Sequence, residues 1–202
     1  MIEIKSRATG EVLARIDAAT LEGADFRGHD LRSADFREKT LCGAKFCGSD
    51  LRDAVFFGAD LRNADFRGAS WFGSTFYCLG SNADDRPDVR GARFDFEIPV
   101  IENIHTAVYQ AALQPGALDM DYWHKECGTA HCRAGWVVTI AGEAGKEIED
   151  IIGTAGAAAL IYQASDPSMD RIPDFLASNE EALSDMKRLA EKGAAEMIRA
   201  IP

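Results

Sequence analysis

The chain has 202 residues, with 22 basic and 33 acidic side chains and a formal net charge of −11 at pH 7. This acidic balance argues against a nucleic-acid-binding protein, which needs lysine and arginine to neutralise phosphates. No apolar stretch approaches the length of about 18 residues that a membrane span requires, and residues 1–5 lack the features of a signal peptide. The 5 cysteines form no small-scaffold disulfide pattern, which favours reduced thiols and a cytoplasmic location.

Residues 2–16 carry the pattern of a β-hairpin. Apolar residues lie on both sides of a turn at Thr9 and Gly10. We expect residues 1–18 to cover the N-terminal end of the structure that follows, because an uncovered backbone edge would promote aggregation.

A strict period of five residues dominates the next part of the chain. Every fifth residue is large and apolar: Leu21, Phe26, Leu31, Phe36, Leu41, Phe46, Leu51, Phe56, Leu61, Phe66, Trp71 and Phe76. Helices repeat their faces near 3.6 residues and strands near 2, so neither explains this pattern. A backbone that turns a corner every five residues does, and four corners make a coil of about 20 residues that can stack on the next coil.

Units such as Ala24-Asp25-Phe26-Arg27-Gly28 and Ala64-Asp65-Phe66-Arg67-Gly68 resemble the pentapeptide-repeat family, whose pattern is A(D/N)LXX. The resemblance covers residues 19–78 and implies a right-handed quadrilateral β-helix. The central Leu or Phe, and the small residue two positions before it, would point inward. His29, Lys39 and Ser49 occupy the small position, so we expect them to weaken the packing of the second and third coils or to make the chain bulge.

The outward positions carry Asp before and Arg after many central residues, as in Asp25 and Arg27. This pattern fits either a solvated, charge-laced wall or a patterned binding wall. Phe57, Phe72 and Tyr77 depart from it near the last coil. We therefore predict that these three aromatic residues contact either the helical domain or a partner.

The acidic charge lies mainly in the second half of the chain. Residues 1–95 have 14 basic and 16 acidic side chains, whereas residues 96–202 have 8 and 17. Some pentapeptide-repeat proteins resemble DNA in charge and shape and bind topoisomerases. A short, nearly neutral repeat region disfavours that role here.

From residue 96 onwards the pattern becomes helical. Residues 79–100 indicate an irregular last coil and a linker. Ser178 and Glu181 form a capping-box pattern at the start of the last helix. Helices are predicted at 102–113, 131–141, 144–152, 154–164 and 179–200, with Gly142 separating the second from the third. The expected fold class is therefore β plus α, in three parts: a hairpin cap at 1–18, a repeat β-helix at 19–95 and an all-α domain at 96–202.

A cluster of Cys and His residues lies between Trp123 and Trp136. The candidate metal ligands are His124, Cys127, His131 and Cys132, but their spacing is poor for zinc. A nucleophilic cysteine lacks an orienting third residue, and a Cys127–Cys132 disulfide would need an oxidising compartment. The remaining alternative is core packing, with Cys132 and Trp136 on one helix face and His131 or Thr129 as the helix cap.

The second half of the chain also resembles a helical domain of phage and prophage proteins. The resemblance depends on the run His131-Cys132-Arg133-Ala134-Gly135-Trp136 and on residues 177–183. It implies a phage-encoded accessory protein, either a virion component or an inhibitor directed at the host.

Together these patterns favour a non-catalytic interaction or structural protein that binds another protein or assembly through its helical domain, including Glu180 and Glu181. We expect no cofactor, no bound metal, no membrane contact and no direct nucleic-acid contact. One alternative is a DNA mimic or decoy that inhibits a DNA-processing enzyme such as gyrase. Another is a metal-binding protein or thiol-dependent enzyme that uses the Cys/His cluster. The location would be cytoplasmic, or the virion if the protein is phage-encoded.

Overall fold

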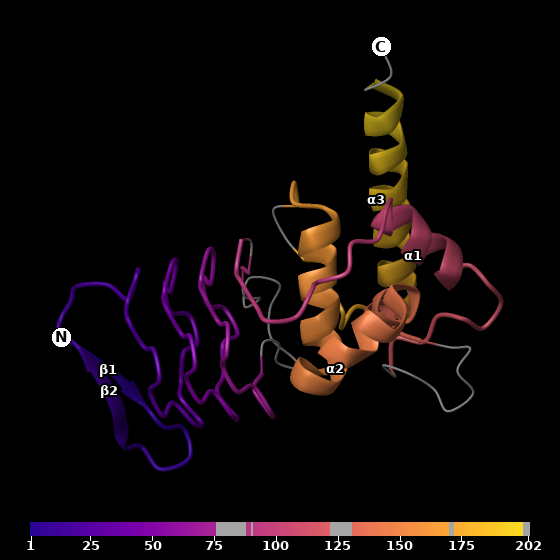
Figure 1. The fold of residues 1–202 in the computed structure, drawn as a ribbon. Helices are drawn as coiled ribbons and strands as arrows, with labels where there is room; N and C mark the ends of the chain where they lie inside the picture. Colours follow the sequence, from indigo (N-terminus) through magenta and orange to yellow (C-terminus); the bar gives the residue numbers. More distant parts are fainter. Residues whose placement is uncertain (76–87, 90, 122–130, 170–171, 200–202) are drawn as a thin grey trace. The chain divides into compact units, whose positions relative to one another are not determined.

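The computed structural model describes residues 1–75, 88–89, 91–121, 131–169 and 172–199. The chain divides into two compact units. The first is Met1–Glu97 with Ile151–Gly156, and the second is Ile98–Asp150 with Ala157–Pro202. Within the first unit, Figure 1 shows a hairpin followed by a stack of narrow coils drawn in purple and magenta.

The N-terminal hairpin consists of β1 (Ile2–Lys5) and β2 (Val12–Ile16), which pair antiparallel. Beyond β1, Ser6 forms an antiparallel bridge with Ala34. The Asp35 N–H donates to the Lys5 carbonyl oxygen at 3.0 Å. The hairpin therefore satisfies backbone groups of the first coil.

Each coil is joined to the next by parallel β-bridges between residues 20 apart, as in Asp25↔Lys45 and Lys45↔Asp65. At each corner the N–H three residues after the central apolar residue donates to that residue's carbonyl oxygen. The residue two positions after the central one has a φ between 57° and 75°. Since a positive φ reverses the chain locally, this position produces the corner. The eleven positions are Gly23, Gly28, Ser33, Glu38, Gly43, Gly48, Asp53, Gly58, Asn63, Gly68 and Gly73.

The large apolar residues of the repeat fill the interior of the stack. Those from Leu21 to Trp71 are between 0% and 7% exposed, while Phe76 lies outside the described residues. The rings of Phe46 and Phe66 stack at a centroid distance of 4.9 Å, and neighbouring columns meet edge to face, as Phe36 does with Phe46 at 5.4 Å. Both are favourable aromatic geometries, so the rings pack tightly and specifically.

The small inward positions divide into two groups. Ser49 is buried, and its hydroxyl donates to the Phe46 carbonyl oxygen at 2.7 Å, so this polar group is satisfied inside the stack. His29 and Lys39 are exposed, while their backbone N–H groups keep the normal corner hydrogen bonds. We expected these residues to weaken the packing or to make the chain bulge. At His29 and Lys39 the side chain turns to solvent instead, and the backbone of the corner is unchanged.

The last coil contains an insertion. Asp60 pairs with Asp88 and Asp65 with Arg93, which are 28 residues further along the chain instead of 20. Phe94 consequently stacks on Phe66 at 5.4 Å, and the Asp95 carboxylate accepts a hydrogen bond from the Gly68 N–H. The repeat column thus continues beyond the regular region.

The described part of the second unit contains helices α1 (Ile104–Ala112), α3 (Asn179–Arg199) and most of α2 (Arg133–Ser165). Helix α1 packs against α3. Residues 157–162 of α2 are buried on every side, which makes this segment the centre of the unit's core. A β-helix followed by helices confirms the predicted β plus α class.

Helix α2 is assigned as one element of 33 residues, whereas the sequence predicted three short helices there. The backbone nevertheless leaves the right-handed helical region at Gly142 and Gly153, where φ is 67° and 77°. These two glycines divide α2 near the predicted boundaries, because only glycine adopts such a φ readily inside a helix.

Candidate functional site

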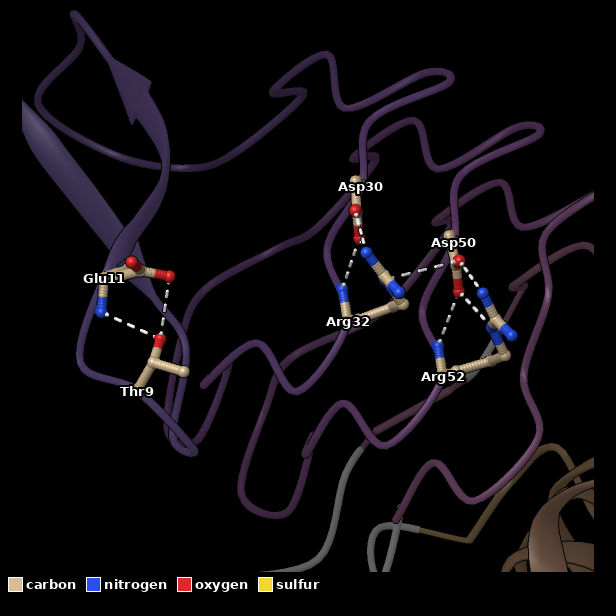
Figure 2. A network of polar contacts seen from close by, with 6 residues as sticks. All are labelled: Thr9, Glu11, Asp30, Arg32, Asp50 and Arg52. Carbon is tan, nitrogen blue, oxygen red and sulfur yellow. Dashed lines mark hydrogen bonds and ion pairs between the residues drawn. The ribbon is translucent and has the colours of Figure 1, made fainter.

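The outer wall of the repeat consists of Asp–Arg pairs two residues apart. In each pair the arginine Nε and Nη2 atoms donate to the carboxylate, and the arginine backbone N–H also donates to it. In the pair Asp30–Arg32 the side-chain distances are 2.8 and 2.6 Å. Figure 2 shows this pair beside Asp50–Arg52 of the next coil. The other pairs are Asp25–Arg27, Asp35–Arg37, Asp60–Arg62 and Asp65–Arg67.

These pairs determine the charge state of the wall. Hydrogen bonds from Arg32 lower the pKa of Asp30 to about 2, and those from Arg67 hold the pKa of Asp65 well below its usual range. Further contacts link neighbouring coils, since Arg32 lies 3.8 Å from Asp50 and Arg93 lies 2.8 Å from Asp65. The carboxylates of Asp30 and Asp65 are therefore ionised at neutral pH. An arginine neutralises the carboxylate in each pair, so the wall presents alternating charge rather than an anionic strip.

The three aromatic residues that depart from this pattern differ in their surroundings. The Phe57 side chain is half-buried, with the Arg37 guanidinium 5.5 Å from its ring centroid. Phe72 is 76% exposed. It lies directly above Arg52 in the stack, because the Asp53 N–H donates to the Phe72 carbonyl oxygen. Tyr77 lies outside the described residues.

The described half of the Cys/His cluster packs inside the helical unit. Cys132 is the N-cap of α2, and its Sγ accepts a hydrogen bond from the Gly135 N–H at 3.3 Å. Burial raises the pKa of the Cys132 thiol to about 11, so it stays protonated at neutral pH and is a poor nucleophile and metal ligand. His131 is buried with its ring edge-on to Trp136 at 4.6 Å. The prediction that His131 caps the helix is wrong, since the helix begins one residue later.

His124, Cys127 and Thr129 lie outside the described residues. Among the residues that the structure does describe, no group of three His, Cys, Asp or Glu side chains could hold a metal ion.

A buried polar cluster of the helical unit has no counterpart in the sequence-based predictions. The Arg133 guanidinium is almost fully buried; its Nε donates to the Tyr162 hydroxyl at 3.1 Å and its Nη1 to Asp185 at 2.6 Å. His105 Nε2 lies 3.0 Å from Asp166, and the His105 ring stacks on Tyr162 at 5.8 Å. The sequence feature that could have indicated this cluster is Arg133, a charged residue in the otherwise apolar first turns of α2.

The two acidic interaction candidates have different roles at the start of α3. Glu181 accepts hydrogen bonds from the Ser178 N–H and hydroxyl at 3.0 and 2.7 Å, and its own N–H donates to Ser178 Oγ. This is the predicted capping box. Glu180 is exposed. Only Glu180 can therefore be replaced without removing a helix cap.

Comparison with known proteins identifies the family to which the repeat is similar. A family model described as "Pentapeptide repeats" matches residues 14–38 and 40–70 with 8 copies. No curated protein matches the chain. In the described residues, no helix has both the length and the apolar character to span a membrane.

Three solved structures are similar to the chain. A pentapeptide-repeat protein of the Arabidopsis thaliana thylakoid lumen is 25% identical over 45% of this chain and 74% of its own, with a TM-score of 0.15. QnrB1, a plasmid-mediated fluoroquinolone resistance protein, is 19% identical over 44% and 58%, with a TM-score of 0.18. HetL of Nostoc, which is involved in heterocyst differentiation regulation, is 22% identical over 34% and 44%, with a TM-score of 0.12.

The family match coincides with the stacked coils, the five-residue corners and the Asp–Arg wall. Residues 14–38 and 40–70 of this chain are pentapeptide repeats.

Proposed function

We propose that this chain is a non-catalytic protein that binds another protein, with the repeat coil serving as a rigid support for the contact surface. The observation that carries the proposal is the change in surface character at the end of the repeat. Earlier coils present neutralised Asp–Arg pairs, whereas the position above Arg52 in the stack carries the exposed Phe72 instead of an arginine. Aromatic side chains are enriched at protein interfaces, and an exposed one on a rigid support is suited to such a contact.

The proposal has further parts that extend the same argument. The coil is four-sided, as a 20-residue period with a corner every five residues implies, and right-handed by resemblance. The hairpin at 1–18, the repeat at 19–95 and the helical part at 96–202 act as three domains. The helical domain contributes acidic side chains such as Glu180 to the contact. The phage accessory role depends on resemblance alone and stays a prediction.

The two alternatives fit the described residues less well. A DNA mimic requires uncompensated negative charge along the rod, but arginines neutralise the carboxylates of the wall. A thiol enzyme requires an ionisable, accessible cysteine, and Cys132 is buried with a raised pKa.

Affinity capture from cells that naturally contain the protein tests the proposal. The bait would be the full chain, compared with Phe72→Ser and with Arg52→Ser, the matched control directly below Phe72 in the stack. We expect a specific protein to be enriched by the wild type and by Arg52→Ser, and to be reduced about tenfold or more with Phe72→Ser. Equal capture by all three baits would place the contact elsewhere and contradict the proposal.

A further inference from the structure

A charged hollow lies between the hairpin and the first coil. It has a volume of about 420 Å³ and is lined by Glu3, Lys5, Asp35, Arg37, Glu38 and Lys39. Small-molecule sites are usually enclosed and mostly apolar, whereas this hollow is open and lined by three acidic and three basic residues. Its chemistry therefore suits a protein surface that carries both charges.

Four of the six lining residues are already paired within the chain. Glu3 forms ion pairs with Lys5 at 3.3 Å and with Arg15 at 3.1 Å, and Arg37 forms one with Asp35 at 2.5 Å. Glu38 and Lys39 are exposed, and their side chains form no ion pair within the described residues. The hollow thus presents one available carboxylate beside one available ammonium group.

The backbone at this point is unusual for its side chain. Glu38 has a φ of 57°, which is costly for a residue with a Cβ. Asn, Asp and Ser, which occupy the other non-glycine corners, have short polar side chains that suit this conformation better than Glu does. The next coil has glycine at the equivalent position, and a Cβ on Gly58 would lie 3.2 Å from Glu38 Cγ. Glu38 is thus the one long, charged side chain among the eleven corner positions, and Gly58 leaves space beside it.

Lys39 departs from the repeat in a second way. It occupies the small position, where Ala44 and Ala54 are buried, yet it remains in solvent beside Glu38. Glu38 and Lys39 thus place a carboxylate and an ammonium group, both unpaired among the described residues, at neighbouring positions of the exposed surface.

We propose that this hollow is a self-association site, in which two copies of the chain meet about a two-fold axis and Glu38 of each copy pairs with Lys39 of the other. A two-fold contact brings the same patch of both copies together, so the patch must be complementary to itself. An adjacent acid and base satisfy that requirement, and the other lining pairs are balanced in the same way. This contact is separate from the binding of another protein proposed above.

The area available at one hollow is small, so the dimer is weak and depends on salt. Interfaces below about 1,200 Å² of total buried area are typical of transient complexes. Added salt screens exposed charges over a Debye length of about 8 Å at physiological ionic strength, and the association weakens accordingly.

Analytical ultracentrifugation of the full chain, from about 10 µM to about 1 mM, tests this site by charge exchange. The wild-type mass should rise from 22.0 kDa toward twice that value as concentration increases. Glu38→Lys and Lys39→Glu should each weaken association about tenfold or more, because each places like charges across the axis. The double exchange Glu38→Lys with Lys39→Glu should restore association, as should an equimolar mixture of the two single variants.

Two further variants separate folding from charge. Glu38→Gly removes the carboxylate while relieving the positive φ, so it should remain folded and associate less. Lys45→Glu reverses an exposed lysine elsewhere on the repeat and should associate like the wild type. A wild type that stays at 22.0 kDa throughout would overturn the proposal. The proposal would also be overturned if Glu38→Lys and Lys39→Glu associated as strongly as the wild type, or if the double exchange did not restore association.

Discussion

Phe46 lies at the centre of the aromatic interior, and its replacement by alanine is the sharpest perturbation of the repeat. Its ring stacks on Phe26 at 5.0 Å and on Phe66 at 4.9 Å, and it meets Phe36 and Phe56 edge to face at 5.4 and 6.0 Å. The side chain is fully buried. Phe46→Ala removes four aromatic contacts and leaves a cavity between rigid coils that cannot easily collapse.

The expected loss follows from those contacts. A buried Phe→Ala change costs about 3–5 kcal/mol, and the rigid stack places this site toward the upper end. Urea unfolding followed by circular dichroism would measure it. Arg27→Ala is the control, because its pair with Asp25 is exposed to solvent and contributes little to stability. Equal midpoints for Phe46→Ala and wild type, with a loss in Arg27→Ala, would refute the stacking register.

Three other predictions concern backbone strain, buried charge and thiol chemistry. Gly43→Ala should lower the free energy of unfolding by about 1 kcal/mol through its φ of 68° alone, since no atom lies within 4 Å of the added Cβ. Glu38→Gly should raise the stability by a similar amount, because it relieves a φ of 57°; thermal melts would measure both changes. Asp185→Asn should lose about 3 kcal/mol at pH 7, because the buried Arg133 loses its counter-ion. Burial raises the pKa of Asp185, but hydrogen bonds from Arg133 and Arg188 outweigh this effect and lower the pKa overall. The stabilisation by the Arg133–Asp185 pair is therefore present above about pH 4 and is lost as the pH falls further. In Asp185→Asn, an acid titration of stability should not show this loss. In the native state at pH 7.5, Cys132 should resist iodoacetamide, whereas rapid labelling would contradict its burial and raised pKa.

The repeat was predictable because its pattern is local and periodic. A corner every five residues determines which side chains point inward, so burial from Leu21 to Trp71 follows from spacing alone. The insertion before Asp88 did not follow, because the point where a chain resumes stacking depends on contacts with an earlier coil. Ala92-Arg93-Phe94 fits the repeat pattern, but nothing in these three residues identifies Asp65 as the partner of Arg93.

The helical unit shows the limits of local patterns more clearly. Gly142 marked a division of α2 correctly, since glycine is rare inside helices without a reason. Arg133 was overlooked because its partners, Tyr162 and Asp185, lie 29 and 52 residues away and belong to other turns of the fold. The hollow between the hairpin and the first coil is likewise formed by residues distant in sequence.

The central claim is that the surface around Phe72, near the end of the repeat, contacts another protein. A photo-cross-linking amino acid at position 72, compared with the same group at position 32 in the same column of the stack, tests it most directly in cells that naturally contain the protein. The account predicts a discrete cross-linked product with a different protein from position 72 and none from position 32. Cross-links from position 72 that remain within the chain, or equal products from both positions, would contradict it.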